Sequence, residues 1–176
     1  MNDRAVFLDR DGVLMRDSNY VDHVDRVEII EGAPQALRRL KDAGFWLVVE
    51  TNQSGVGRGY FPRQAVEDIH AMLDTHFSKA IDRYYVCPHH PEDNCDCRKP
   101  KPKFLHEAAR EFGLDLQRCF MVGDRVSDVQ CGINGGAKTV LVLTGVGRET
   151  LNKGEVTPDR VAKDIGEATD CILASP

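Results

Sequence analysis

The sequence has 176 residues, of which 41% are hydrophobic and 29% are charged. This length suits one domain, residues 1–176, whose core is large enough that no metal has to replace it. The formal net charge of −5 argues against nucleic acid or an anionic membrane as the main partner, whereas a small anionic substrate needs only a few local cations.

Strand-like and helix-like segments alternate along the chain. Apolar runs predict β-strands at 5–8, 45–51, 83–87, 119–124 and 139–145, and the run ATDCIL at 168–173 is a candidate sixth strand. Apolar residues at helical spacing predict helices at 34–44, 63–77, 102–114 and 127–137. The alternation predicts an α/β fold with a doubly wound parallel sheet and helices on both faces. The irregular segment 13–32 is too short for a large cap domain, so we expect an open site.

The chain shows no targeting or membrane-spanning pattern. No stretch approaches the roughly 20 apolar residues of a membrane span, and the opening residues MNDRAVFLDRDG have no small-residue cleavage site. We therefore expect a cytoplasmic protein and, because no large apolar interface is evident, a monomer. In that compartment cysteines are more often thiols or metal ligands than disulfides. Cys119, Cys131 and Cys171 stand alone, and we expect them to be small buried side chains.

Aspartates follow two of the predicted strands. Asp9 and Asp11 come directly after the first strand, and Asp124 and Asp128 come after the fourth. Because open parallel sheets bind ligands at the carboxyl ends of their strands, we expect these carboxylates to share one site with Mg²⁺. One carboxylate can attack phosphorus, and another can protonate the leaving oxygen and then deprotonate water. Asp-x-Asp-Gly alone is also typical of a polar turn or a calcium loop, but its place after a buried strand favours catalysis.

Other polar groups are placed to bind a phosphate. Thr51 ends the second predicted strand, and its hydroxyl and the backbone N–H groups that follow are suited to phosphate oxygens. Lys99 is a compact cation for a transferring phosphoryl group, and Arg98 beside it suits a second anionic group. Alone, these patterns would indicate a plain turn and a solvated pair of cations. The carboxylates favour the phosphate site.

A loop rich in cysteine and histidine, CPHHPEDNCDC, follows the third predicted strand. Cys87, His89, Cys95 and Cys97 supply three thiolates and one imidazole, a set typical of tetrahedral Zn²⁺. Protein ligands fill all four positions, which indicates a structural zinc site rather than a catalytic one. His90 is the spare imidazole of the loop. A Cys95–Cys97 disulfide is the alternative, and it is disfavoured by the short separation and by the cytoplasm.

These motifs resemble the haloacid dehalogenase superfamily of phosphatases over nearly the whole chain. DRDG, TNQSG, CPHH with CDCRKP, and GDRVSD occur in the order found in the D-glycero-D-manno-heptose-1,7-bisphosphate 7-phosphatase family. The segment TNQSGVGRGYF is more similar to that family than to the related histidinol-phosphate phosphatases. The resemblance implies a Mg²⁺-dependent phosphatase that removes the 7-phosphate of this sugar through an aspartyl-phosphate.

The resemblance also implies roles for individual residues. Asp9 would be the nucleophile and Asp11 the general acid and base, assisted by Thr51 and Lys99. The Mg²⁺ site would comprise Asp9, Asp11 through its backbone carbonyl, Asp124 and, in support, Asp128. Residues that match substrate-binding positions lie on the loops around the site: Asp17, Ser18, Asn19, Tyr20, Asn52, Gln53, Ser54, Arg98 and Arg125.

Two features depart from the heptose family. Met15 stands where asparagine is common, and Cys87 and Cys95 are only eight residues apart, as in the histidinol-phosphate type. Both features bear on substrate shape rather than on the chemistry. The alternative substrate is therefore histidinol phosphate or another small sugar phosphate. The non-enzymatic alternative is a zinc-stabilised binding module on a decayed phosphatase fold, which the complete set of carboxylates disfavours.

Overall fold

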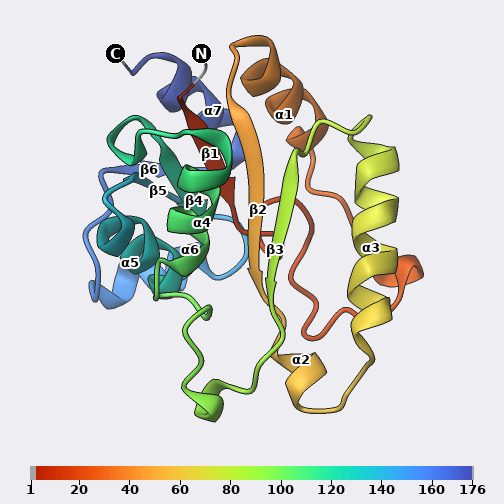
Figure 1. The fold of residues 1–176 in the computed structure, drawn as a ribbon. Coiled ribbons are helices and arrows are strands. Elements are labelled where there is room, and N and C mark those ends of the chain that lie inside the picture. The colour runs from red at the N-terminus through yellow and green to blue at the C-terminus, as the bar shows by residue number, and fades with distance from the viewer. Residues whose placement is uncertain (1–2, 176) are drawn as a thin grey trace.

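The fold is built on one six-stranded sheet whose neighbouring strands are all parallel (Figure 1). The computed structural model describes residues 3–175. The strands are β1 (Ala5–Leu8), β2 (Trp46–Asn52), β3 (Arg83–Cys87), β4 (Phe120–Gly123), β5 (Lys138–Val142) and β6 (Arg160–Ala162). Their order is β3-β2-β1-β4-β5-β6, so the direction of winding reverses between β1 and β4. Ligands bind outside the carboxyl ends of the strands at such a reversal.

Helices cover both faces of this sheet (Figure 1). The α-helices are α1 (Ala33–Asp42), α2 (Ser54–Gly57), α3 (Arg63–His76), α4 (Lys103–Phe112), α5 (Val126–Gly135), α6 (Gly147–Lys153) and α7 (Ile165–Leu173), and the short 3-10 turns are η1 (Val24–Arg26), η2 (Pro91–Asp93) and η3 (Leu116–Arg118). Helices α1, α3 and α7 share one core with the sheet, and α4 and α5 share the other. The predicted α/β class and doubly wound parallel sheet are confirmed.

The central strands are apolar on both sides because each side of the sheet is covered. In β1, Val6 and Leu8 belong to the core under α1, α3 and α7, while Ala5 and Phe7 belong to the core under α4 and α5. All four side chains are fully buried. The strand ends at Leu8, and the polar sequence that follows begins at the carboxyl edge of the sheet.

The C-terminal region differs from the prediction. Residues 168–173, the candidate sixth strand, belong to helix α7, and the sixth strand is β6. Ile165 and Ile172 are buried on the inner side of this helix, and Asp164 caps it by accepting a hydrogen bond from Glu167 N. The prediction was wrong because so short an apolar run does not distinguish a buried helix from a buried strand. The short helices α2 and α6 were also not predicted.

The segment 13–32 is largely irregular, as predicted, and contains only the short turn η1 within the described chain. It places Val13, Leu14 and Val21 in the core together with Met15. Met15 is fully buried and does not line the cavity described below. The position that was expected to influence substrate shape therefore contributes to the core instead.

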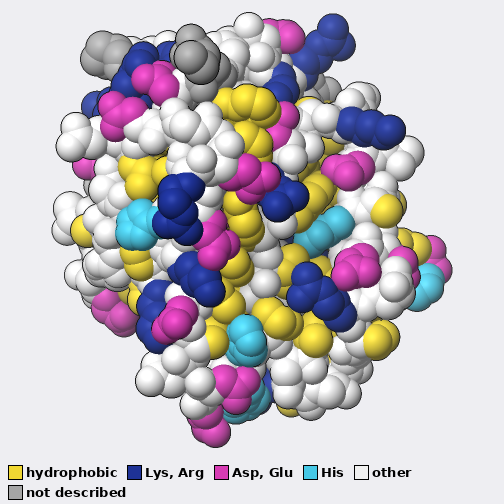
Figure 2. Space-filling view, in the orientation of Figure 1, with side chains coloured by type: hydrophobic (Ala, Val, Ile, Leu, Met, Phe, Trp, Pro, Cys, Tyr) yellow, Lys and Arg dark blue, Asp and Glu magenta, His cyan; other side chains and the backbone are white. Residues whose placement is uncertain are grey.

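Charged side chains of both signs are mixed on the surface. Figure 2 shows Lys and Arg interspersed with Asp and Glu over the visible face, without one large basic patch on that face. No helix within residues 3–175 is long and apolar enough to cross a membrane.

Candidate active site

A cavity of about 350 Å³ lies at the carboxyl ends of β1 and β2, beside the loop that follows β4. Its lining comprises Asp9, Arg10, Asp11, Asp17, Asn19, Tyr20, Val21, Thr51, Asn52, Gln53, Ser54, Arg98, Lys99, Arg125, Ser127 and Asp128. Nearly all predicted catalytic and substrate-binding residues thus meet at one place. Of the others, Asp124 is fully buried behind the lining, and Ser18 is exposed on the neighbouring loop.

Lys99 is a buried cation surrounded by acceptors. Its Nζ lies 3.0 Å from Asp9 Oδ1 and 2.8 Å from Asp128 Oδ1. It also donates a hydrogen bond to the Glu50 carbonyl at 2.7 Å. Burial opposes the charged form, but the surrounding carboxylates, Asp128 first, outweigh burial and raise the pKa of Lys99. Burial raises the pKa of Asp9, Lys99 opposes this rise, and the neighbouring carboxylates add to it. The lysine is therefore a fixed positive charge beside Asp9.

Asp11 is held by donors from two side chains. Arg10 donates from Nε to Asp11 Oδ2 and from Nη2 to Asp11 Oδ1, both at 3.1 Å. Gln53 Nε2 donates to Asp11 Oδ2 at 2.8 Å and to Thr51 Oγ1 at 2.8 Å. Since Thr51 Oγ1 accepts this bond, its hydroxyl hydrogen is available for a bound anion.

Three buried carboxylates form a group suited to a metal ion. Asp9, Asp124 and Asp128 bring oxygens within 4.8 Å of one another. Asp124 Oδ2 accepts a hydrogen bond from Val146 N at 2.8 Å, whereas its buried Oδ1 has no hydrogen-bond partner within the described chain. Burial, with Asp128 adding to it, raises the pKa of Asp124 to about 7. Buried carboxylates with an unpartnered oxygen fit a hard divalent cation such as Mg²⁺.

Two glycines provide the space for the Asp124 carboxylate. Gly12 has φ +86° and Gly145 has φ +55°, and a Cβ on either residue would overlap this carboxylate. Thr144 Oγ1 donates to the Gly12 carbonyl at 2.5 Å and so joins the two turns. Sequence reasoning missed Gly145, because this residue contributes space rather than a functional group.

Asn52 fastens the backbone of Lys99 to the end of β2. Lys99 N donates to Asn52 Oδ1 at 3.2 Å, and Asn52 Nδ2 donates to the Lys99 carbonyl at 3.3 Å. Asn52 was predicted to bind substrate, and it does line the cavity. Its side chain is engaged with the backbone of Lys99, so it fixes the place from which the lysine side chain extends.

The loop that contains Asp17 is tied across the cavity. Arg125 Nη2 pairs with Asp17 Oδ2, and Asp17 Oδ1 accepts a hydrogen bond from Asn19 N at 3.1 Å. Tyr20 packs edge-on against Tyr60, with the ring centroids 4.9 Å apart. Both Asn19 and Tyr20 have positive φ angles, so the loop turns sharply at these residues.

The three arginines that line the cavity, Arg10, Arg98 and Arg125, differ in their partners. Arg125 is paired with Asp17, whereas the buried Nη1 of Arg98 has no hydrogen-bond partner among the described residues. A buried donor without an acceptor is costly. Nη1 of Arg10 is likewise buried without a partner, but the guanidinium of Arg10 is paired with Asp11, so Arg98 is the arginine best suited to receive an anion.

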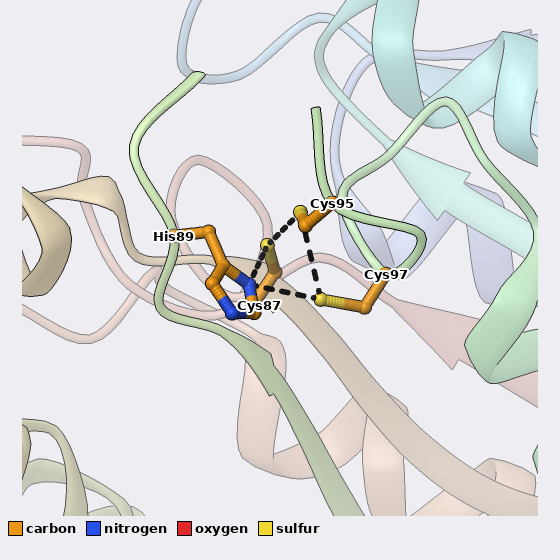
Figure 3. A group of neighbouring side chains, drawn as sticks. All are labelled: Cys87, His89, Cys95 and Cys97. Atoms are coloured by element: carbon orange, nitrogen blue, oxygen red, sulfur yellow. Dashed lines mark hydrogen bonds between the residues drawn. The ribbon is translucent and has the colours of Figure 1, made fainter. Parts of the chain in front are cut away.

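Cys87, His89, Cys95 and Cys97 converge after β3, as Figure 3 shows. Cys87 Sγ lies 3.6 Å from Cys95 Sγ and 3.7 Å from His89 Nδ1. Cys97 Sγ lies 3.7 Å from Cys95 Sγ and 3.3 Å from His89 Nδ1. Two sulfurs on one tetrahedral zinc at about 2.3 Å lie about 3.8 Å apart, so the group fits this ion. The alternative Cys95–Cys97 disulfide is wrong, because both cysteines are free.

The loop that holds this group is attached to the segment that follows β2 by backbone hydrogen bonds. Gln53 N donates to the Cys87 carbonyl and Gly57 N to the Pro88 carbonyl, both at 2.8 Å. The spare imidazole, His90, accepts a hydrogen bond from Glu92 N and caps η2. In Figure 1 the loop extends below β3, next to α2.

Glu50 is a buried acid that sequence reasoning missed. Its side chain is fully buried beneath Lys99, and Cys131 Sγ lies 3.7 Å from its Oε1. Burial raises the pKa of Glu50 to about 7, with Lys99 opposing and Asp128 adding to the rise. A glutamate within the apolar run of β2 was the available signal. Arg10, Val21 and Ser127 also line the cavity without having been predicted.

Comparisons with known proteins agree with this geometry. Residues 96–168 match the model of the HAD-hydrolase-like family. The chain is similar to the D-glycero-beta-D-manno-heptose-1,7-bisphosphate 7-phosphatase of Escherichia coli (strain K12), with 42% identity over 96% of this chain and 93% of that protein. The enzyme of the same name from Haemophilus influenzae is 40% identical over 92% of each chain. The crystal structure of D,D-heptose 1,7-bisphosphate phosphatase from B. bronchiseptica, complexed with magnesium and phosphate, has a TM-score of 0.92 and 35% identity, over 97% of this chain and 98% of that one.

Proposed function

Because the chain belongs to the family of D-glycero-beta-D-manno-heptose-1,7-bisphosphate 7-phosphatases, we propose that it removes the 7-phosphate of this bisphosphate. The observation that carries the proposal is the buried Asp9–Lys99 pair, with Asp11 beside it, in a cavity at the carboxyl edge of the sheet. The magnesium and phosphate bound by the B. bronchiseptica enzyme support the same chemistry.

In the first step, Asp9 attacks the phosphorus of the substrate. Asp9 Oδ1 forms an ion pair with Lys99 Nζ and accepts a hydrogen bond from Arg10 N, so Oδ2 is the oxygen that remains free to attack. As the bond from Oδ2 to phosphorus forms, the bond from phosphorus to the sugar oxygen breaks, and Asp11 gives that oxygen a proton. Lys99 and the Thr51 hydroxyl stabilise the negative charge on the phosphoryl oxygens.

In the second step, water releases the phosphate. Asp11, now a carboxylate, takes a proton from the water as its oxygen attacks the phosphorus. The bond from phosphorus to Asp9 breaks, and inorganic phosphate leaves. Asp9, the carbonyl of Asp11 and Asp124 would hold Mg²⁺, with Asp128 in support. When bound, Mg²⁺ supplies positive charge that offsets the repulsion between carboxylates and phosphate.

We assign substrate recognition to the rim of the cavity. Arg98 is placed to bind the phosphate that is not cleaved, because its buried Nη1 lacks a partner in the described part of the chain. Arg125 and the loop 17–20 would contact the sugar. The zinc loop joins β3 to Arg98 and Lys99, so its role is to fix where these cations point.

A phosphate-release screen over sugar phosphates tests the proposal. The panel should contain both anomers of the heptose bisphosphate and histidinol phosphate, each with and without Mg²⁺. We expect the highest kcat/KM with one heptose bisphosphate anomer and no release without Mg²⁺. A higher kcat/KM for histidinol phosphate would favour the second candidate, which the eight-residue spacing of Cys87 and Cys95 supports. No Mg²⁺-dependent hydrolysis of any ester would refute an enzymatic function and favour a binding module.

A further inference from the structure

Arg10 lies between the two aspartates of the DRDG motif, and the reaction described above gives its side chain no role. Only 1% of this residue is exposed, which is rare for an arginine. Its Nε and Nη2 each donate to a different oxygen of Asp11 at 3.1 Å. Two parallel N–H bonds fix both the distance and the plane of a carboxylate. Arg10 therefore determines the orientation of the Asp11 side chain.

The backbone of Arg10 is held in place, whereas the buried Nη1 of its guanidinium has no hydrogen-bond partner among the described residues. The backbone carbonyl of Arg10 accepts a hydrogen bond from Leu14 N at 3.0 Å. His70, stacked on Tyr84 with ring centroids 4.1 Å apart, lies on helix α3 near Arg10. Burial, and then the charge of Arg10, lower the pKa of His70 to about 3, so this ring adds no second positive charge. The Arg10 side chain is thus buried near the neutral imidazole of His70.

Gln53 cannot replace the pair of hydrogen bonds that Arg10 donates to Asp11, called the fork below. It makes one bond to Asp11, at Oδ2, and its Nε2 also contacts Thr51. A single bond leaves a carboxylate free to rotate about it. Only Arg10 contacts both oxygens of Asp11 within the described chain.

We propose that Arg10 is a positioning residue that holds the Asp11 carboxylate in the orientation needed for both proton transfers. The proposal rests on the proposed function, because it requires Asp11 to act as acid and then as base. In this role Arg10 exchanges no proton and is not required to contact the reacting atoms. Its effect therefore passes entirely through Asp11.

An aryl phosphate separates this role from a merely structural one. p-Nitrophenolate is a good leaving group and needs no proton, so the first step with p-nitrophenyl phosphate does not depend on Asp11, whereas release of the covalent phosphate still needs the base. In R10M, we expect the first-turnover release of p-nitrophenolate to stay within about threefold of wild type, while steady-state turnover falls about 10- to 100-fold. Phosphate bound covalently to acid-quenched protein should accumulate. R63Q, which removes an exposed arginine of α3, should change neither rate.

The double variant R10M/D11N completes the test. If Arg10 acts only through Asp11, R10M should change the rates of D11N by less than about twofold. Equal slowing of both steps in R10M, or full multiplication of the two effects, would overturn the proposal. R10K keeps the charge but not the fork, and it serves the same test if R10M does not fold. If D11N accumulates no covalent phosphate, the aspartyl-phosphate mechanism itself fails. If D11N accumulates it and R10M does not, only the role of Arg10 fails.

Discussion

Replacing Glu50 with glutamine should make the protein more stable at alkaline pH. The side chain is fully buried, and burial raises the pKa of Glu50 to about 7 from 4.5 in an unfolded chain. The folded state thus binds this proton more tightly than the unfolded state. The stability that the protonated group provides is complete below about pH 4.5 and is lost as pH rises through about 7. Glutamine has nearly the same shape and carries no charge at any of these pH values.

The size of the effect follows from the difference between the two pKa values. A difference of 7 − 4.5 = 2.5 units, at about 1.36 kcal/mol each, corresponds to about 3 kcal/mol at pH 8. At pH 5 the same difference contributes less than about 1 kcal/mol, because pH 5 lies only about half a unit above the pKa of the unfolded chain, while the folded group is still protonated. With a urea slope of about 2 kcal/mol per molar, the unfolding midpoint of E50Q should exceed that of wild type by about 1.5 M at pH 8.

Urea unfolding at pH 5 and pH 8, followed by circular dichroism without added Mg²⁺, measures this difference. Glu31 is exposed, so E31Q is the matched control and should move neither midpoint appreciably. The reasoning is refuted if E50Q has the same midpoint as wild type at pH 8, or if its advantage does not grow between the two pH values.

Three further changes test the catalytic and metal sites. D9N should lower turnover by on the order of 10⁴-fold or more with an unchanged circular dichroism spectrum, and an active variant would show that Asp9 is not the nucleophile. G12A should abolish Mg²⁺-dependent activity, because the added Cβ overlaps the Asp124 carboxylate; G32A has a similar φ and open space, so it should cost only about 1–2 kcal/mol of stability and keep its activity. C95S should lose zinc by elemental analysis, unfold at lower temperature and raise KM more than it lowers kcat; unchanged KM and folding without zinc would contradict the role of the loop.

The parts of the site that could be predicted are those in which one residue type has one use. Asp9 and Asp11 follow the buried strand β1, Lys99 ends the loop that follows β3, and the topology of a parallel sheet brings such positions together. The convergence of the Cys/His group was predictable for a similar reason, because Cys87 and His89, with two more cysteines, have few other uses at that spacing.

Other parts depend on neighbours that only the fold supplies. Glu50 is buried because of how β2 packs, and the sequence around it does not reveal which groups surround its carboxyl group. Gly145 is needed because a second turn lies against Asp124, which no local pattern reveals. Residues 168–173 were a candidate strand because their apolar run is ambiguous by itself. The packing against α1 that favours the helix involves residues distant in sequence.

The hydrogen bonds between Asn52 and the backbone of Lys99 have a consequence for how specificity can change. Lys99 is fastened directly to the sheet, and the loop before it is fastened at Cys87 by Gln53. The stretch between His89 and Cys95 can therefore vary in length without moving the backbone of Lys99, provided that the four Cys/His side chains still converge. Residues could be inserted between His89 and Cys95 to reshape the rim for a different sugar while the phosphoryl-transfer centre stays intact. We therefore expect that the loop between Cys87 and Lys99 can be replaced by the corresponding loop of a related enzyme.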